Sequence, residues 1–119
     1  MSHHEDETRL RHMLDHAAEA IEMVRGRTRR DIDADRQLNL ALVRLLEIVG
    51  EAAARVSHEG RERCAEIPWQ EIIGLRNRLA HGYDEVDFDI LWHIVQGDLP
   101  PLITRLKKAL ERISSSPAD

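Results

Sequence analysis

Residues 35–57 read DRQLNLALVRLLEIVGEAAARVS, and this stretch decides the fold. One set of its apolar side chains recurs at steps of three and four residues, the period of one face of an α-helix: Leu38, Ala41, Leu42, Leu45, Val49, Ala52 and Val56. Leu40 and Val43 are apolar on other faces, which predicts a helix at the centre of a bundle or against a second protomer. The remaining polar strip consists of Arg44, Glu47, Glu51 and Arg55.

Helical patterns continue on both sides of this stretch. Upstream, a helix is predicted over about 6–25, with one apolar stripe: Leu10, Met13, Leu14, Ala17, Ile21 and Val24. Gly26 is placed to end it, and one of Asp31, Asp33 and Asp35 to cap the next. Downstream, residues 58–67 are interpreted as a connection. Three further helices are predicted over about 68–80, 88–96 and 100–113, begun by Pro68, Asp87 and the pair Pro100-Pro101.

The predicted fold class is therefore all-α, an antiparallel bundle of four to five helices. The chain has 119 residues, enough for one core, so we expect a single helical domain over 1–119 with a flexible tail at about 114–119. Hydrophobic residues make up 42% and charged residues 33%, but only four residues are aromatic. That composition favours packed helices over a β-sandwich.

Charge and cysteine content narrow the possible roles. Cys64 is the only cysteine, which is typical of a reducing compartment, and neither a signal-peptide core nor a membrane-spanning run is visible. We therefore expect a cytoplasmic protein with no membrane partner. The formal net charge of −5 argues against a broad, non-specific nucleic-acid binder. A role on RNA would require a small local cationic site.

Such a site is predicted at residues 76–83, which read RNRLAHGY. On a continuous helix, Arg76 would lie within an apolar face made by Trp69, Ile72, Ile73 and Ala80, where a guanidinium must be paired or open to a cleft. Arg78 would point the opposite way, as an ordinary solvated residue. His81 could turn toward Arg76 only if the helix ends before it.

These residue types suit cleavage of an RNA phosphodiester without a metal or other cofactor. The ribose 2′-hydroxyl serves as the nucleophile and a 2′,3′-cyclic phosphate is the expected product. His81 would move the proton, because an imidazole titrates near neutral pH. Arg76 would bind two phosphate oxygens and stabilise the transition state. Asn77 would support them with an amide donor and acceptor.

The pattern Arg76-x4-His81-x-Tyr83 resembles the motif of the HepT-like ribonuclease toxins of the HEPN superfamily. The flanking stretches LEIVGEA at 46–52, WQEIIGLRN at 69–77 and DFDILW at 87–92 agree with it, so the resemblance covers about 10–113. The bare Arg-x4-His spacing is common by chance, and the flanks make it specific.

The resemblance implies several further properties. It implies a helical-bundle ribonuclease, usually a homodimer with the motif at the cleft between protomers. It also implies the toxin role in a toxin–antitoxin pair of the type II or VII kind, whose antitoxin is a minimal nucleotidyltransferase. That partner attaches AMP to the motif tyrosine, here Tyr83. The added bulk and charge would lie where the substrate phosphate must bind.

Plainer interpretations remain open for each residue. Arg76 could pair with Glu47 or Glu51 as a structural arginine, and His81 could interact with the helix dipole. Asn77 could only orient Arg76 or cap the helix, and Tyr83 could have no role. At the level of function, the main alternative is a catalytically silent dimeric module that engages the nucleotidyltransferase. A third, a nucleotide-binding helical domain, would require saturable ATP binding without any partner.

Other candidate positions favour ordinary roles. His12 and His16 are four residues apart, as metal ligands can be, but no ligand set accompanies them, so no metal site is predicted. Cys64 is interpreted as a buried or inert thiol. The cluster Arg25, Arg27, Arg29 and Arg30 could contact RNA or the antitoxin, but such clusters are usually solvated loops.

Overall fold

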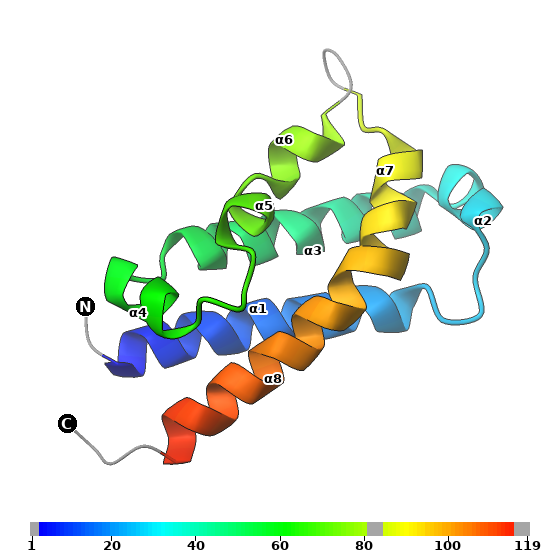
Figure 1. The fold of residues 1–119 in the computed structure, drawn as a ribbon. Coiled ribbons are helices and arrows are strands. Elements are labelled where there is room, and N and C mark those ends of the chain that lie inside the picture. Colours follow the sequence, from blue (N-terminus) through cyan, green and yellow to red (C-terminus); the bar gives the residue numbers. More distant parts are fainter. Residues whose placement is uncertain (1–2, 81–84, 116–119) are drawn as a thin grey trace.

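The computed structural model describes residues 3–80 and 85–115, and in this part of the chain the protein is an all-α bundle (Figure 1). Three long helices form its frame: α1 (His3–Met23), α3 (Arg36–Ala54) and α8 (Leu99–Ser115). Helix α1 packs against both others, and it runs antiparallel to each of them. The predicted fold class is therefore confirmed.

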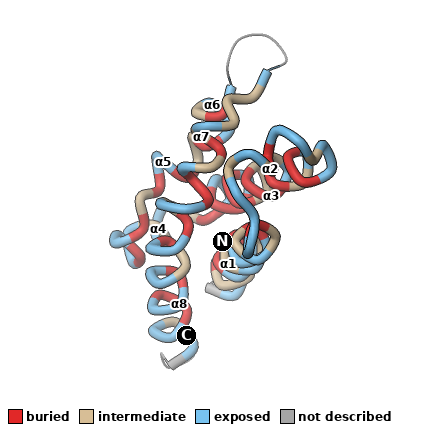
Figure 2. Tube along the Cα trace, turned by 90° about the vertical axis from the view of Figure 1, so that its right-hand side faces the viewer, coloured by how far each residue is buried: buried red, intermediate tan, exposed pale blue. Residues whose placement is uncertain are grey.

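The predicted apolar faces form the core. Leu10, Met13 and Ala17 of α1 are almost fully buried, as are Leu42 and Val49 of α3. Figure 2 shows the buried positions on the sides of the helices that face one another. Leu40, apolar on another face of α3, is half exposed, so the alternative of a face against a second protomer stays a prediction.

The predicted helix ends are close to those observed. Gly26 adopts a φ of 76°, which only glycine accepts readily, just after α1. The Asp35 side chain accepts a hydrogen bond from the backbone N–H of Leu38 and so caps α3. Asp87 likewise caps α7 (Phe88–His93) by accepting from the N–H groups of Asp89 and Ile90.

Short helices occupy both stretches that were interpreted as breaks. Helix α2 (Arg29–Ala34) precedes α3, and α4 (His58–Arg63) follows it. The Ser57 hydroxyl accepts from the N–H of Gly60 and donates to the buried carboxylate of Asp6, which ties the start of α4 to α1. Such short helices have too few residues to show a periodic apolar stripe, so only their capping residues indicate them in the sequence.

The predicted start of the last helix at Pro100-Pro101 is confirmed to within one residue, since α8 begins at Leu99, but the expected gap before it is absent. Helix α7 continues through a π-helical turn (Ile94–Asp98) directly into α8, as one unbroken run in Figure 1. Prolines lack the N–H groups that an α-helix would use at these positions, and their rings clash with the carbonyls four residues earlier. The wider π turn accommodates that clash, so the prolines fall in the first turn of α8 without ending the helix.

The predicted helix over 68–80 is divided in two. Helix α5 (Trp69–Ile73) ends at Gly74, which has φ −83° and ψ 5°, and α6 (Leu75–Leu79) follows at once. The expected tail at 114–119 begins inside α8, and residues 116–119 lie outside the described residues.

Candidate active site

Arg76 and Asn77 lie on the exposed side of the short helix α6. His81 and Tyr83, the other residues predicted for the site, lie outside the described residues. The structure therefore positions the arginine and amide of the predicted constellation. It also describes both ends of the segment that carries the imidazole and the phenol.

The described residues on either side of that segment lie next to each other. Helix α6 ends at Leu79, and Ala80 is extended with φ −65° and ψ 131°. Ala80 then forms an isolated antiparallel bridge with Val86, and the backbone N–H of Asp87 donates to the Leu79 carbonyl at 2.9 Å. The helix thus ends before His81, as the sequence analysis required.

The apolar face predicted around Arg76 is wrong, but the Arg76 guanidinium is open beside a hollow, as the sequence required of it. Its side chain is 84% exposed, whereas Leu75 and Leu79 of the same helix are buried. The prediction centred the apolar face on Ile73 and Arg76 and left those two leucines out. Leucine gains free energy when it is buried, whereas a guanidinium loses hydration, so the leucines take the inner side of α6.

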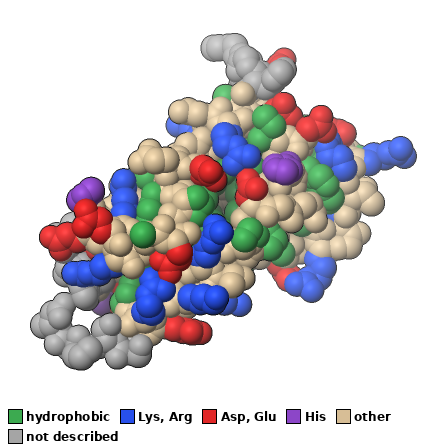
Figure 3. Space-filling model, in the orientation of Figure 1, with side chains coloured by type: hydrophobic (Ala, Val, Ile, Leu, Met, Phe, Trp, Pro, Cys, Tyr) green, Lys and Arg blue, Asp and Glu red, His purple; other side chains and the backbone are tan. Residues whose placement is uncertain are grey.

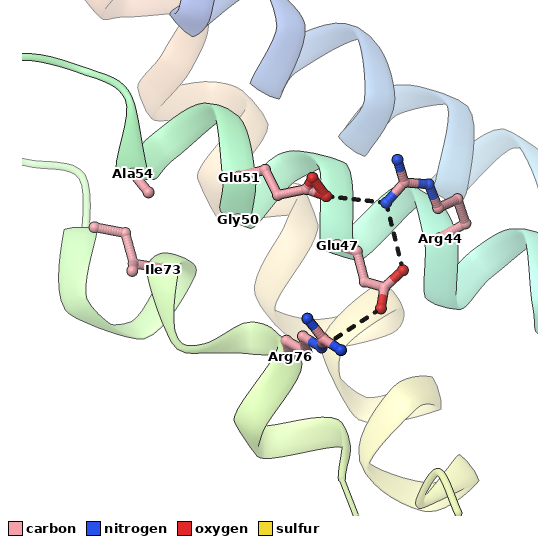
Figure 4. Close-up of a pocket in the computed structure, with 7 residues that line it drawn as sticks. All are labelled: Arg44, Glu47, Gly50, Glu51, Ala54, Ile73 and Arg76. Carbon is pink, nitrogen blue, oxygen red and sulfur yellow. Dashed lines mark hydrogen bonds and ion pairs between the residues drawn. The ribbon is translucent and has the colours of Figure 1, made fainter. Parts of the chain in front are cut away.

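Arg76 instead borders a hollow of about 390 Å³ between α3 and the α5–α6 pair. Figure 4 shows Arg44, Glu47 and Glu51 on the α3 side of this hollow and Arg76 opposite them. Gly50, Ala54 and Ile73 supply its apolar lining.

Gly50 sets how closely α5 approaches α3. A Cβ atom at this position would stand 3.1 Å from the backbone carbonyl oxygen of Ile72, closer than most real contacts of that kind. The missing side chain lets the two helices come together, and α6 follows α5 through Gly74. The hollow and the position of Arg76 therefore depend on this contact.

The Glu47 carboxylate lies between two arginines (Figure 4). Its Oε1 is 3.6 Å from Nη1 of Arg44, and its Oε2 is 3.8 Å from Nε of Arg76. Arg44 also donates a hydrogen bond of 2.9 Å to Glu51, and this bond raises the pKa of its guanidinium above the ordinary value. The pairing of Arg76 with Glu47, an alternative for a structural arginine, is thus present but long, and it leaves the guanidinium accessible.

The environment predicted for Arg78 is also wrong. Its Nη1 donates a 3.0 Å hydrogen bond to Asp98 in the π turn, and its side chain is only 37% exposed. His93 lies 3.9 Å from the other oxygen of Asp98. The π turn that positions Asp98 leaves no simple sequence pattern, which is why this link between α6 and the last helical run was missed.

The remaining candidates have ordinary surroundings. Cys64 is buried, as predicted, and burial raises the pKa of its thiol. His16 contacts the backbone carbonyl of His12 at 2.6 Å. In 3–80 and 85–115, no three His, Cys, Asp or Glu side chains are grouped to hold a metal ion. No helix in these ranges could cross a membrane.

The basic cluster is divided among acidic partners. Arg25 pairs with Glu22 at 2.9 Å, and Arg27 with Asp35 at 3.4 Å. Arg29 donates to Asp33 and Asp89 at 3.0 and 2.9 Å. These pairs favour the interpretation as a solvated surface over that of a dedicated anion site.

The arrangement around Arg76 can bind an anion. An exposed guanidinium presents a planar fork of N–H groups that fits two oxygens of a phosphate. The long contact to Glu47 holds this fork near the end of α6, and the segment with His81 begins one residue after Ala80. A phosphodiester on Arg76 would therefore lie close to where that segment starts.

Comparison with known proteins identifies related chains. The family model described as "Ribonuclease HepT-like" matches residues 13–109. A protein of Caldanaerobacter subterraneus subsp. tengcongensis named "Putative RNase" is 37% identical over 103 residues, covering 87% of this chain and 92% of the relative. A "Putative RNase" of Methanocaldococcus jannaschii is 34% identical over 99 residues, covering 83% and 87%. A "Probable ribonuclease HepT" of Thermococcus cleftensis is 36% identical over 99 residues, covering 80% and 90%. No solved structure is significantly similar.

Proposed function

The chain belongs to the HepT-like ribonuclease family, and from this premise we propose that it cleaves RNA without a metal, using Arg76 and His81. The observation that carries the proposal is the exposed Arg76 guanidinium of α6, whose contact with Glu47 is as long as 3.8 Å. Arg76 binds the scissile phosphate and stabilises the charge of its transition state. His81 moves the proton of the attacking 2′-hydroxyl or of the leaving oxygen. Asn77, beside Arg76, supports the same phosphate.

The proposal includes a biological setting. The protein acts as the toxin of a toxin–antitoxin pair, as a homodimer with the motif at the cleft between protomers. Its antitoxin is a minimal nucleotidyltransferase that attaches AMP to Tyr83. The exposed outer strip of α3 and the exposed end of α6 support this setting, because both remain open to a partner.

Cleavage by the wild type and three variants tests the catalytic proposal. Wild-type protein should cut RNA in the presence of a chelator, and Arg76→Ala and His81→Ala should each lower kcat by about 100-fold or more. Asn77→Ala should cost less. Circular dichroism checks that the helices are retained. Equal cleavage by the wild type and both variants would mean that these residues do not catalyse.

The same experiment addresses the alternative, a catalytically silent dimeric module. That module would bind the nucleotidyltransferase yet leave RNA intact even as wild type. The absence of wild-type cleavage, with intact helices and retained partner binding, would therefore replace the ribonuclease proposal with this one.

A further inference from the structure

Two arginines from different elements converge on one carboxylate. Arg44 comes from α3 and Arg76 from α6, and each faces a different oxygen of Glu47, at 3.6 and 3.8 Å. Both distances are too long for hydrogen bonds, so these contacts are weak ion pairs. The arginine side chains are 60% and 84% exposed, which leaves both guanidiniums accessible from the hollow. Nη1 of Arg44 also donates a 2.9 Å hydrogen bond to Glu51, so a phosphate would bind the Nε and Nη2 side of this guanidinium.

A phosphodiester has the chemistry to replace this carboxylate at each of the two arginines separately. Both groups present two anionic oxygens on one central atom, and arginine binds either through two N–H groups. We propose that Arg44 binds a phosphodiester of the RNA strand that flanks the one cleaved at Arg76. Before RNA binds, the Glu47 carboxylate offsets the mutual repulsion of the two guanidiniums, and it turns away when RNA binds. This inference rests on the proposed function, since it extends the same site along the substrate.

The charge balance of the hollow sets how strongly such a strand binds. Two arginines and two glutamates line it, so its formal charges cancel. Figure 3 shows acidic and basic side chains intermixed on the face that it draws, with no broad basic patch there. Affinity must therefore come from a few local contacts. Glu47 and Glu51 repel phosphate, so the loss of any one of those contacts should weaken RNA binding measurably.

Salt dependence of binding measures the Arg44 contact. The probe is a fluorescent single-stranded 2′-O-methyl RNA, which lacks the nucleophile and cannot be cut. It is titrated with the protein at several KCl concentrations. Arg44→Gln should weaken binding severalfold and flatten the slope of log K against log salt by roughly 0.7, the value for one phosphate contact on a single strand. Arg44→Lys, which keeps the charge, should keep the slope.

Arg11→Gln is the matched control. Arg11 is an exposed arginine of α1 that pairs with Glu7 at 3.3 Å, and it does not line the hollow. Its loss changes the net charge by the same amount, so it should leave the slope as in the wild type. Glu47→Gln should tighten binding, because it removes a competitor and a repulsive charge. An Arg44→Gln protein that matches Arg11→Gln in affinity and slope would overturn the inference.

Cleavage kinetics separate this inference from the function on which it rests. With an all-ribose substrate, Arg44→Gln should raise KM severalfold and leave kcat close to the wild-type value. Wild-type cleavage with an unchanged KM in Arg44→Gln would contradict the role of Arg44 alone. Failure of the wild type to cleave would contradict the proposed function instead.

Discussion

Two arginines two residues apart on α6 have different tasks. Arg78 is half-buried and bonded to Asp98 of the π turn, so it ties α6 to the last helical run. Arg76 is exposed and only loosely paired with Glu47, so it remains available to a ligand. The spacing predicted the opposite surroundings, with Arg76 on an apolar face and Arg78 solvated, because it did not weigh the burial of Leu75 and Leu79. Competition among neighbouring side chains for the core decides which charge stays accessible.

At the same scale, a single modification would control the proposed site. Co-expression with a minimal nucleotidyltransferase should add the mass of AMP to the peptide that contains Tyr83, and should abolish RNA cleavage. The reason is the added negative charge and bulk close to Arg76. Peptide mass spectrometry provides the measurement, with Tyr83→Phe as the control that accepts no AMP at this position. A Tyr83 peptide that stays unmodified in the presence of an active transferase would rule out regulation by AMPylation of Tyr83.

Among the elements, the contact between α3 and α5 determines the shape of the site. The absence of a side chain at Gly50 lets the Ile72 carbonyl approach, and α5 passes directly into α6 through Gly74. A shift of α5 would therefore move Arg76 relative to Arg44 and Glu47. The π turn also affects the position of α6, because it places Asp98 where Arg78 of α6 can donate a hydrogen bond to it.

Gly50→Ala tests this contact. The added Cβ would lie 3.1 Å from a backbone oxygen, so α5 must move. We expect a loss of about 1 kcal/mol in the free energy of unfolding despite the better helix propensity of alanine, and weaker RNA cleavage. Gly97→Ala is the control, because the nearest atom to its added Cβ, Cε1 of His93, would be 3.8 Å away. Urea unfolding measures both, and a Gly50→Ala protein as stable as Gly97→Ala would contradict this account.

For the whole molecule, the sequence predicted the elements with long apolar periods. The stripes of α1 and α3 and the caps at Asp35 and Asp87 follow from local rules, and all are observed. Where local rules compete with tertiary packing, the predictions were wrong. Pro100-Pro101 indicated a gap before the last helix, but a π turn joins α7 to α8 without one. Gly74 divides a helix that its periodicity predicted as continuous.

The same distinction applies to the candidate site. Residue chemistry indicated Arg76 as a site candidate and Glu47 or Glu51 as its potential partner, and Glu47 is the one in contact. The convergence of Arg44 on the same carboxylate could not be predicted, because it depends on how α6 packs against α3. Long-range placement of this kind arises from burial of Leu75 and Leu79 and from the close approach at Gly50.

The ends of the RNA products test the central claim most directly. A mixed-sequence RNA and a DNA of the same sequence are incubated with the protein in the presence of a chelator. The account predicts that only the RNA is cut, leaving 2′,3′-cyclic phosphate and 5′-hydroxyl ends, because the 2′-hydroxyl attacks and His81 and Arg76 replace a metal. Cutting of the DNA at a similar rate, or complete loss of RNA cleavage in the chelator, would contradict it.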